Sequence, residues 1–373
     1  MRSLVLIIAS FAVTIFCWGA YGPVLHNGRL HMAEEGGHAL WRPFICVGLA
    51  YMAIGIIVPA LLLIWRGEKG HFSPLGILWS FTAGVAGAVG ALGILLAFEY
   101  GGRPLYVMPL VFGGAPVVNA FVTIYMTKRM KDVGPIFLAG LIMVGLGAVT
   151  VLIFKPQLGG GGDAAHETST ANILWQIAWI LLTILCWGTY GPWLHKGQEA
   201  MQHSRLRPLI CVGVAYFVVA VIVPIFILTV HTEASQFTWW GSLWSLGAGA
   251  AGAFGAIGII MAFNFGGRPV YVMPLIFGGA PIVNSFWTII SRDLLDQVSA
   301  MFFAGMILVI AGAAIVLVFA PRGKATTTPD AGMFKKKTSE TKEAQKRPDK
   351  EQAATSSAPG QPSGDAAERT ATT

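Results

Sequence analysis

The sequence predicts an all-α integral membrane protein whose ten transmembrane helices form two inverted-topology five-helix repeats. Three observations support this fold class: the composition, an internal duplication and ten long apolar runs. Of the 373 residues, 55% are hydrophobic and 12% are charged, whereas soluble domains carry about 25% charged residues. This composition argues against a water-soluble globular enzyme, and the net charge of +7 is interpreted as a signal of membrane orientation and not of nucleic-acid binding.

The duplication is visible in three segments that occur twice. CWGAYGPVLHNG at 17–28 recurs as CWGTYGPWLHKG at 186–197, and RPFICVGLAY at 42–51 recurs as RPLICVGVAY at 207–216. In the longest match, 17 of 22 positions agree between 98–119 and 263–284. A repeat of this length indicates two copies of one structural unit.

Each copy contains five apolar runs of about the 20 residues that a helix needs to cross a bilayer. The runs are continuously apolar and do not alternate, which favours helices over a membrane barrel. The expected spans are 4–25, 43–65, 75–98, 104–126 and 134–154, followed by 173–194, 208–230, 241–263, 269–291 and 298–320.

An odd number of spans per copy means that the second copy enters the membrane from the opposite side. The loop charges agree, because Lys128, Arg129 and Lys131 have as their counterparts Arg292 and two aspartates. We therefore expect both termini to be cytoplasmic and the chain to lie in the cell (inner or plasma) membrane.

Four regions follow from this pattern. The first five-helix repeat covers 1–155 and the second covers 173–321. A flexible polar linker, 156–172, joins them, and the basic segment 322–373 is expected to be a disordered cytoplasmic tail.

The candidate substrate-binding residues are polar or aromatic side chains shared by both copies, since inverted repeats place a binding site near the midplane. On the first span of each copy, a Gly-Pro pair is expected to interrupt the helix beside these side chains. The alternative for the Trp and Tyr residues is an interfacial belt, and for the histidines a position at opposite membrane interfaces. The binding candidates are Trp18 and Tyr21, with Trp187 and Tyr190. His26 and His195, on the same spans, are expected to be gate or coupling groups.

A second group lies in the middle of the fourth and ninth spans. Asn119 and Asn284 end matching GGAPxVN segments, and Thr123 and Thr288 follow one helical turn later. An amide in hydrocarbon is costly unless it faces protein or water. These residues therefore either bind substrate or form interhelical hydrogen bonds.

Gates or coupling groups are expected at the EYGGRP and NFGGRP connections. Arg103 and Arg268 lie near opposite membrane faces there, where the alternative is simple anchoring to headgroups. Glu99 is an acid beside a span and its counterpart is Asn264, so we expect an ion pair at one mouth of a pathway that the other lacks.

Glycines at intervals of three, Gly84 to Gly93 on the third span and Gly249 to Gly258 on the eighth, predict a winding groove. Such a groove lets neighbouring helices approach closely.

These features together resemble the drug/metabolite transporter superfamily in its ten-helix, EamA-like and sugar-transporter-like form. The resemblance covers residues 4 to 320. It rests on two fused five-helix repeats, on Trp18-Gly19 and Trp187-Gly188 in the first helix of each, and on the Gly-x-Tyr-x-Pro arrangement from Gly19.

The function predicted first is secondary transport of a small polar, sugar-like metabolite by alternating access, with no enzymatic activity and no cofactor. Glu99 is the expected site of any proton coupling. The expected partners are the solute and membrane lipid, with no nucleic acid, and self-association into a homo-oligomer is left open. The alternatives are an intramembrane enzyme and a non-transporting membrane scaffold.

Overall fold

The computed structural model describes residues 2–34, 39–156, 169–265 and 269–321. Within these residues the helices are joined by turns and loops, and the β-structure found is an isolated bridge between Ala33 and Ser235. Most of the predicted linker and the whole predicted tail lie outside the described residues. The α-helices are α1 (Arg2–Met32), α2 (Trp41–Met52), α3 (Val58–Arg66), α4 (Pro74–Glu99), α5 (Pro104–Met126), α6 (Pro135–Ile153), α7 (Thr170–Ala200), α8 (Leu206–Phe217), α9 (Val223–Val230), α10 (Trp239–Asn264), α11 (Pro269–Ser291) and α12 (Ala300–Phe319).

Nine helical runs in the described part of the chain are long and apolar enough to cross a membrane. Two of them are composite, because a five-residue π-helix joins α2 to α3 and another joins α8 to α9, giving the runs Trp41–Arg66 and Leu206–Val230. The remaining expected span corresponds to α11, where the apolar stretch found is Leu275–Ser291. The chain is therefore a multi-pass helical membrane protein.

Several helices begin where the sequence offers a start signal. Ser73 accepts a hydrogen bond from the amide of Gly76 at 3.1 Å, and Pro74 occupies the first helical position of α4. Proline fits this position because its missing N–H has no partner to lose there. Prolines likewise open α5 and α6.

The expected helix breaks at the two Gly-Pro pairs are wrong. Helix α1 runs through Pro23 and α7 runs through Pro192 without a change of helical type. An internal proline removes one backbone hydrogen bond, which a helix packed among other membrane helices tolerates. The first helix of each half is consequently 31 residues long and extends beyond the predicted span.

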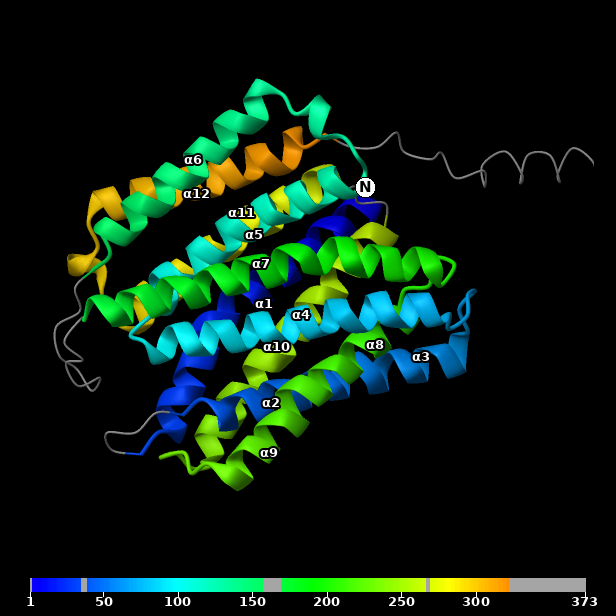
Figure 1. Cartoon of the computed structure of the whole chain (residues 1–373), viewed down its shortest axis with the longest axis horizontal. Coiled ribbons are helices and arrows are strands. Elements are labelled where there is room, and N and C mark those ends of the chain that lie inside the picture. The colour runs from blue at the N-terminus through cyan, green and yellow to red at the C-terminus, as the bar shows by residue number, and fades with distance from the viewer. Residues whose placement is uncertain (1, 35–38, 157–168, 266–268, 322–373) are drawn as a thin grey trace, which may run out of the picture. The chain divides into compact units, whose positions relative to one another are not determined.

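The two halves of the chain interdigitate. Helix α1 packs along α10 of the second half and α7 packs along α4 of the first, while α6 lies beside α12 (Figure 1). The glycine series line the first two contacts, because a Cβ on Gly258 would clash with Thr14 of α1 and one on Gly93 with Thr183 of α7. Earlier in each series, a Cβ on Gly84 or Gly249 would lie 2.6 Å from an atom of α8 or α2, respectively. The predicted close approach of helices at these glycines is confirmed.

Helices α2 and α8 cross each other at glycines beside the π-helices Ala53–Ile57 and Val218–Ile222. A Cβ on Gly48 would lie 2.8 Å from the Cβ of Ala220, and one on Gly213 would lie 2.9 Å from the backbone of Gly55. Single π-helical turns within α-helices often mark functional sites. The crossing brings Tyr51 of α2 and Tyr216 of α8 together.

Loops of one half cap helices of the other at both ends of the bundle. At one end, here called the open end, the Glu68 carboxylate accepts hydrogen bonds from the backbone amides of Arg205 and Leu206 at 2.9 and 3.2 Å. At the other, the closed end, Glu233 accepts from the Trp41 amide at 2.9 Å and from Arg42 at 3.1 Å. Each carboxylate thus satisfies the exposed N–H groups at the start of a helix.

Candidate functional site: a central aromatic cavity

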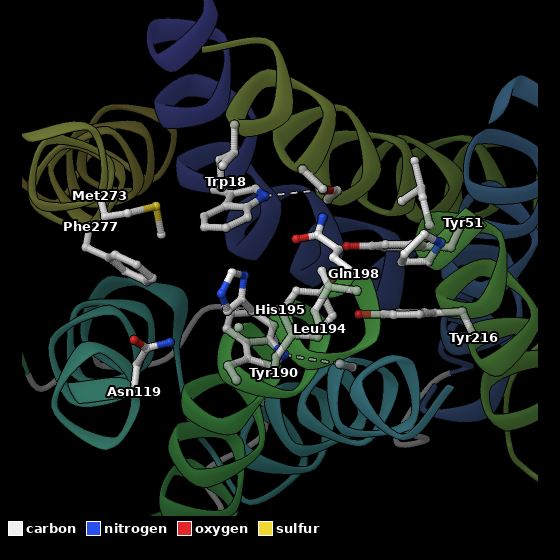
Figure 2. A pocket seen from close by; sticks show the side chains of 18 of the residues that line it. Trp18, Tyr51, Asn119, Tyr190, Leu194, His195, Gln198, Tyr216, Met273 and Phe277 are labelled. Carbon is white, nitrogen blue, oxygen red and sulfur yellow. Dashed lines mark hydrogen bonds between the residues drawn. The ribbon is translucent and has the colours of Figure 1, made fainter. Parts of the chain in front are cut away.

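A cavity of about 420 Å³ lies among α1, α2, α4, α5, α7, α8, α10 and α11. Its lining includes eight Phe, Trp and Tyr side chains that come from equivalent positions of the two halves (Figure 2). Positions are called equivalent where the repeated segments align them. The paired lining residues are Trp18 and Trp187, Tyr21 and Tyr190, Tyr51 and Tyr216, Phe112 and Phe277, and Gly87 and Gly252.

The two tryptophans are held by matching hydrogen bonds. Trp18 Nε1 donates to the carbonyl of Gly252 and Trp187 Nε1 donates to the carbonyl of Gly87, both at 3.2 Å. One turn earlier, Thr14 donates to the carbonyl of Gly255 at 2.9 Å. The indole edges are thus occupied by protein, and the ring faces are left to contact whatever enters the cavity.

Phe112 links the two tryptophans. Its ring centroid lies 6.4 Å from that of Trp18 and 6.2 Å from that of Trp187, and Phe277 lies 6.3 Å away. These separations are typical of aromatic pairs that contact each other. The phenylalanines continue the aromatic wall between the two halves.

Tyr51 and Tyr216 have the shortest centroid separation of the aromatic pairs in the described part of the chain. Their rings are nearly parallel, at an interplanar angle of 6°, with centroids 3.8 Å apart. They are not among the site residues predicted from the sequence. A usable signal was present, because each is the polar residue that ends a repeated RPxICVGxAY segment.

Tyr21 and Tyr190 add two more hydroxyls to the cavity lining. Tyr21 is only 4% exposed, and its hydroxyl has no hydrogen-bond partner among the described residues. A buried polar atom without a partner is costly unless a ligand or water satisfies it. Tyr21, Tyr190 and the two tryptophans thus line one cavity, and their role in binding stays a prediction.

The structure separates the two predicted asparagines. Asn119 lines the cavity, whereas Asn284 is fully buried and donates from Nδ2 to the carbonyl of Pro104 at 2.7 Å. Thr288 is buried beside it and donates to the Asn284 carbonyl at 2.9 Å. Thr123 is half-buried and is not among the lining residues described. The binding role expected for Asn284 and Thr288 is thus replaced here by interhelical and local hydrogen bonding.

The two predicted histidines differ in the same way. His195 is exposed, lines the cavity at its open end and lies 3.3 Å from Glu199. His26 is only 6% exposed and packs edge-on against Phe98, with ring centroids 5.3 Å apart. The pair therefore marks the two ends of the bundle, one accessible and one sealed.

An ion pair lies at the closed end. Arg29 of α1 contacts the carboxylate of Glu99 at the end of α4, and Arg29 also donates to the carbonyl of Ala39 at 3.1 Å. Arg103 begins the connection to α5 close by in the sequence, and Arg268 lies outside the described residues. Asn264 ends α10, but its side chain is not described. An ion pair at Glu99 was expected from the sequence, but Arg29 was not recognised as its partner.

The charged lining residue described is Arg205, which is exposed at the open end. Within the described residues, no group of three His, Cys, Asp or Glu side chains is placed to hold a metal ion. The site offers stacking faces, hydroxyls and amides.

Comparisons with known proteins are informative about the fold alone. No family model and no curated protein match the chain. Among solved structures, one protein of unstated function is similar over 84% of this chain and 99% of its own, at 16% identity and a TM-score of 0.52. The helical bundle thus recurs in a solved structure. Fold and site together define a multi-pass helical membrane protein with a central aromatic cavity.

Proposed function

We propose that this protein is a secondary transporter that moves a small polar, sugar-like metabolite across a cell membrane by alternating access. In such a protein, a cavity between two related structural units opens to one side of the membrane and then to the other. We further propose that ten helices form two inverted repeats and that the protein is related to the drug/metabolite transporters.

One observation carries the proposal: equivalent residues of the two halves are buried at one end of the bundle and line the cavity at the other. Leu25 is fully buried, while its equivalent Leu194 lines the cavity. Met108 is also fully buried, while its equivalent Met273 lines the cavity. Two halves of related sequence thus differ in the way that the two states of an alternating-access cycle would differ, which supports the proposal.

The seal at the closed end has a defined structure. A Cβ on Gly22 would lie 2.6 Å from Met108 Cγ, so α1 and α5 are in close contact there. At the equivalent Gly191, Asn119 is the described neighbour within 4 Å, and no atom of Met273 is that close. Exchanging these two environments would close the open end and open the closed one.

The proposed orientation follows from charge. Lys69 and Arg207 meet at the open end, where Arg207 donates to the Lys69 carbonyl at 3.3 Å, and Arg66 and Arg205 flank this contact in sequence. Cytoplasmic loops carry the excess of Lys and Arg. The open end is therefore proposed to be cytoplasmic, together with both termini.

Reconstitution in vesicles tests the function. Purified protein should accelerate the flux of a neutral metabolite such as a hexose. Leu194→Trp, which fills the open end, should abolish this flux, and Leu185→Trp on the exposed face of the same helix should preserve it. If neither the wild type nor any variant accelerates the flux of any solute under any ion gradient, the protein is not a transporter.

A further inference from the structure

The Tyr51–Tyr216 pair has a geometry that suits recognition better than packing alone. Figure 2 shows both hydroxyl oxygens pointing into the space bordered by Trp18, Tyr190 and Phe277, with the two rings side by side. Stacked rings hold their hydroxyls at a fixed separation, so two neighbouring hydrogen-bonding groups are presented along one wall. Each hydroxyl both donates and accepts a hydrogen bond.

Two glycines leave room for this arrangement. A Cβ on Gly252 would lie 2.5 Å from the Tyr51 hydroxyl, and one on Gly87 would lie 3.0 Å from the Tyr216 hydroxyl. The same two glycines accept the hydrogen bonds of Trp18 and Trp187. One glycine in each half thus positions both a stacking face and a hydroxyl.

The charge of the cavity limits what it can hold. No acidic side chain lines it in the part of the chain that the structure describes, and Arg205 lies at its exposed rim. A carboxylate or a small, strongly hydrated cation moved from water into such a site without an opposite charge loses far more hydration energy than stacking returns. The faces of Trp18 and Phe277, by contrast, favour a flat or ring-shaped molecule.

We infer that the cavity binds an uncharged ring that carries neighbouring hydrogen-bonding groups, and that Tyr51 and Tyr216 bind those groups. The ring stacks on the tryptophan faces, and Tyr21 lies in the same cavity lining. Two kinds of molecule share this chemistry, a pyranose or cyclic polyol and a neutral heteroaromatic base.

The position of the pair gives it a further property, which rests on the proposed transport function. Because Tyr51 and Tyr216 are equivalent residues in contact with each other, an exchange of the two halves' arrangements regenerates the same pair. Asn119 and Asn284 do not share this property, since one lines the cavity while the other is buried. The tyrosines therefore contact the solute whichever end is open.

Direct binding to the full-length protein in detergent tests the inference independently of transport. The probes are glucose and inositol as uncharged polyol rings, uracil and adenine as neutral bases, and glutamate and choline as charged controls. We expect saturable binding of at least one of the four uncharged compounds. Binding of glucose or inositol would identify the ligand as a polyol ring, and binding of uracil or adenine would identify it as a neutral base. Comparable or tighter binding of glutamate or choline would overturn the inferred class.

Conservative variants test the residues. Tyr51→Phe and Tyr216→Phe keep the stacked rings and should each weaken binding about tenfold, the value of one hydrogen bond. Tyr125→Phe, at a residue exposed on α5, is the matched control and should bind as the wild type does. Unchanged affinity in both Tyr51→Phe and Tyr216→Phe would overturn their role. Binding without flux would contradict the transport function and leave this binding site intact.

Discussion

Asn284 of α11 donates a hydrogen bond to the carbonyl of Pro104, the first residue of α5, at 2.7 Å. The bond joins the two halves of the chain at the closed end of the bundle, beside the contact between Gly22 and Met108. Its equivalent residue, Asn119, lines the cavity instead. A buried amide of this kind stabilises the conformation in which its partner is in reach.

If the halves exchange arrangements, Asn284→Ala and Asn119→Ala should shift the balance between the two open states in opposite directions. Asn284→Ala weakens the present seal and shifts the population toward the state open at the other end, by about 1–2 kcal/mol or roughly tenfold. Asn119→Ala should not open that seal. The measurement is thiol labelling of Leu25→Cys and Leu194→Cys in a cysteine-free background.

In the parent protein Leu194→Cys should label faster than Leu25→Cys, because Leu194 lines the cavity and Leu25 is fully buried. Asn284→Ala should raise labelling at position 25 and lower it at position 194. Equal changes in the two asparagine variants would show that these residues only stabilise the fold.

Neutralising Glu99 should loosen the closed end. The carboxylate pairs with Arg29, whose side chain is 7% exposed. Glu99→Gln removes the charge attraction between this carboxylate and the Arg29 guanidinium. We expect faster labelling of Leu25→Cys in Glu99→Gln, and loss of any pH dependence of uptake. A pH profile identical to that of the wild type would place proton sensitivity elsewhere.

Adding a methyl group at Gly252 should destabilise the protein. The new Cβ would lie 2.5 Å from the Tyr51 hydroxyl and 2.9 Å from its ring, and overpacking of this kind costs about 1–3 kcal/mol. Gly247→Ala on the same helix is the control, because its nearest described neighbour is Val24 at 3.8 Å. Thermal unfolding in detergent should show a lower midpoint for Gly252→Ala, with Gly247→Ala at or above the wild type.

The Glu233 carboxylate should matter more for stability than its position in a loop suggests. It accepts hydrogen bonds from the start of α2 and from Arg42 and Ser235. Glu233→Gln retains one acceptor but loses the charge at a helix N-terminus, a loss of about 1 kcal/mol. Glu199→Gln, at an exposed side chain of α7, should leave the unfolding midpoint unchanged. Equal midpoints for both variants would contradict this account.

The repeat allowed much of the site to be predicted, because side chains present in both halves are those that a shared cavity uses. Trp18, Tyr21 and their equivalents were found in this way. The same reasoning failed to separate Asn119 from Asn284, since identical sequences give no sign of which copy is buried. That difference is a property of the conformation and not of local sequence.

Other features escaped prediction for physical reasons. Arg29 and Glu99 are 70 residues apart, and only the packing of α1 against the end of α4 joins them. The Tyr51–Tyr216 stack depends on the crossing of α2 and α8 at glycine contacts, which no pattern within either segment specifies. The Gly-Pro pairs led to a break being predicted where the helix continues. The hydrogen bond that a proline removes does not end a helix that neighbouring helices support on several sides.

The pairing of α4 with α7 and of α1 with α10 has a consequence for biosynthesis. During synthesis, the glycine face of α4 has no α7 to pack against until the second half of the chain has been made. Helix α1 waits longer still for α10. Neither half reaches its final packing alone, so a chain truncated between them leaves two unfilled grooves for membrane quality control to detect.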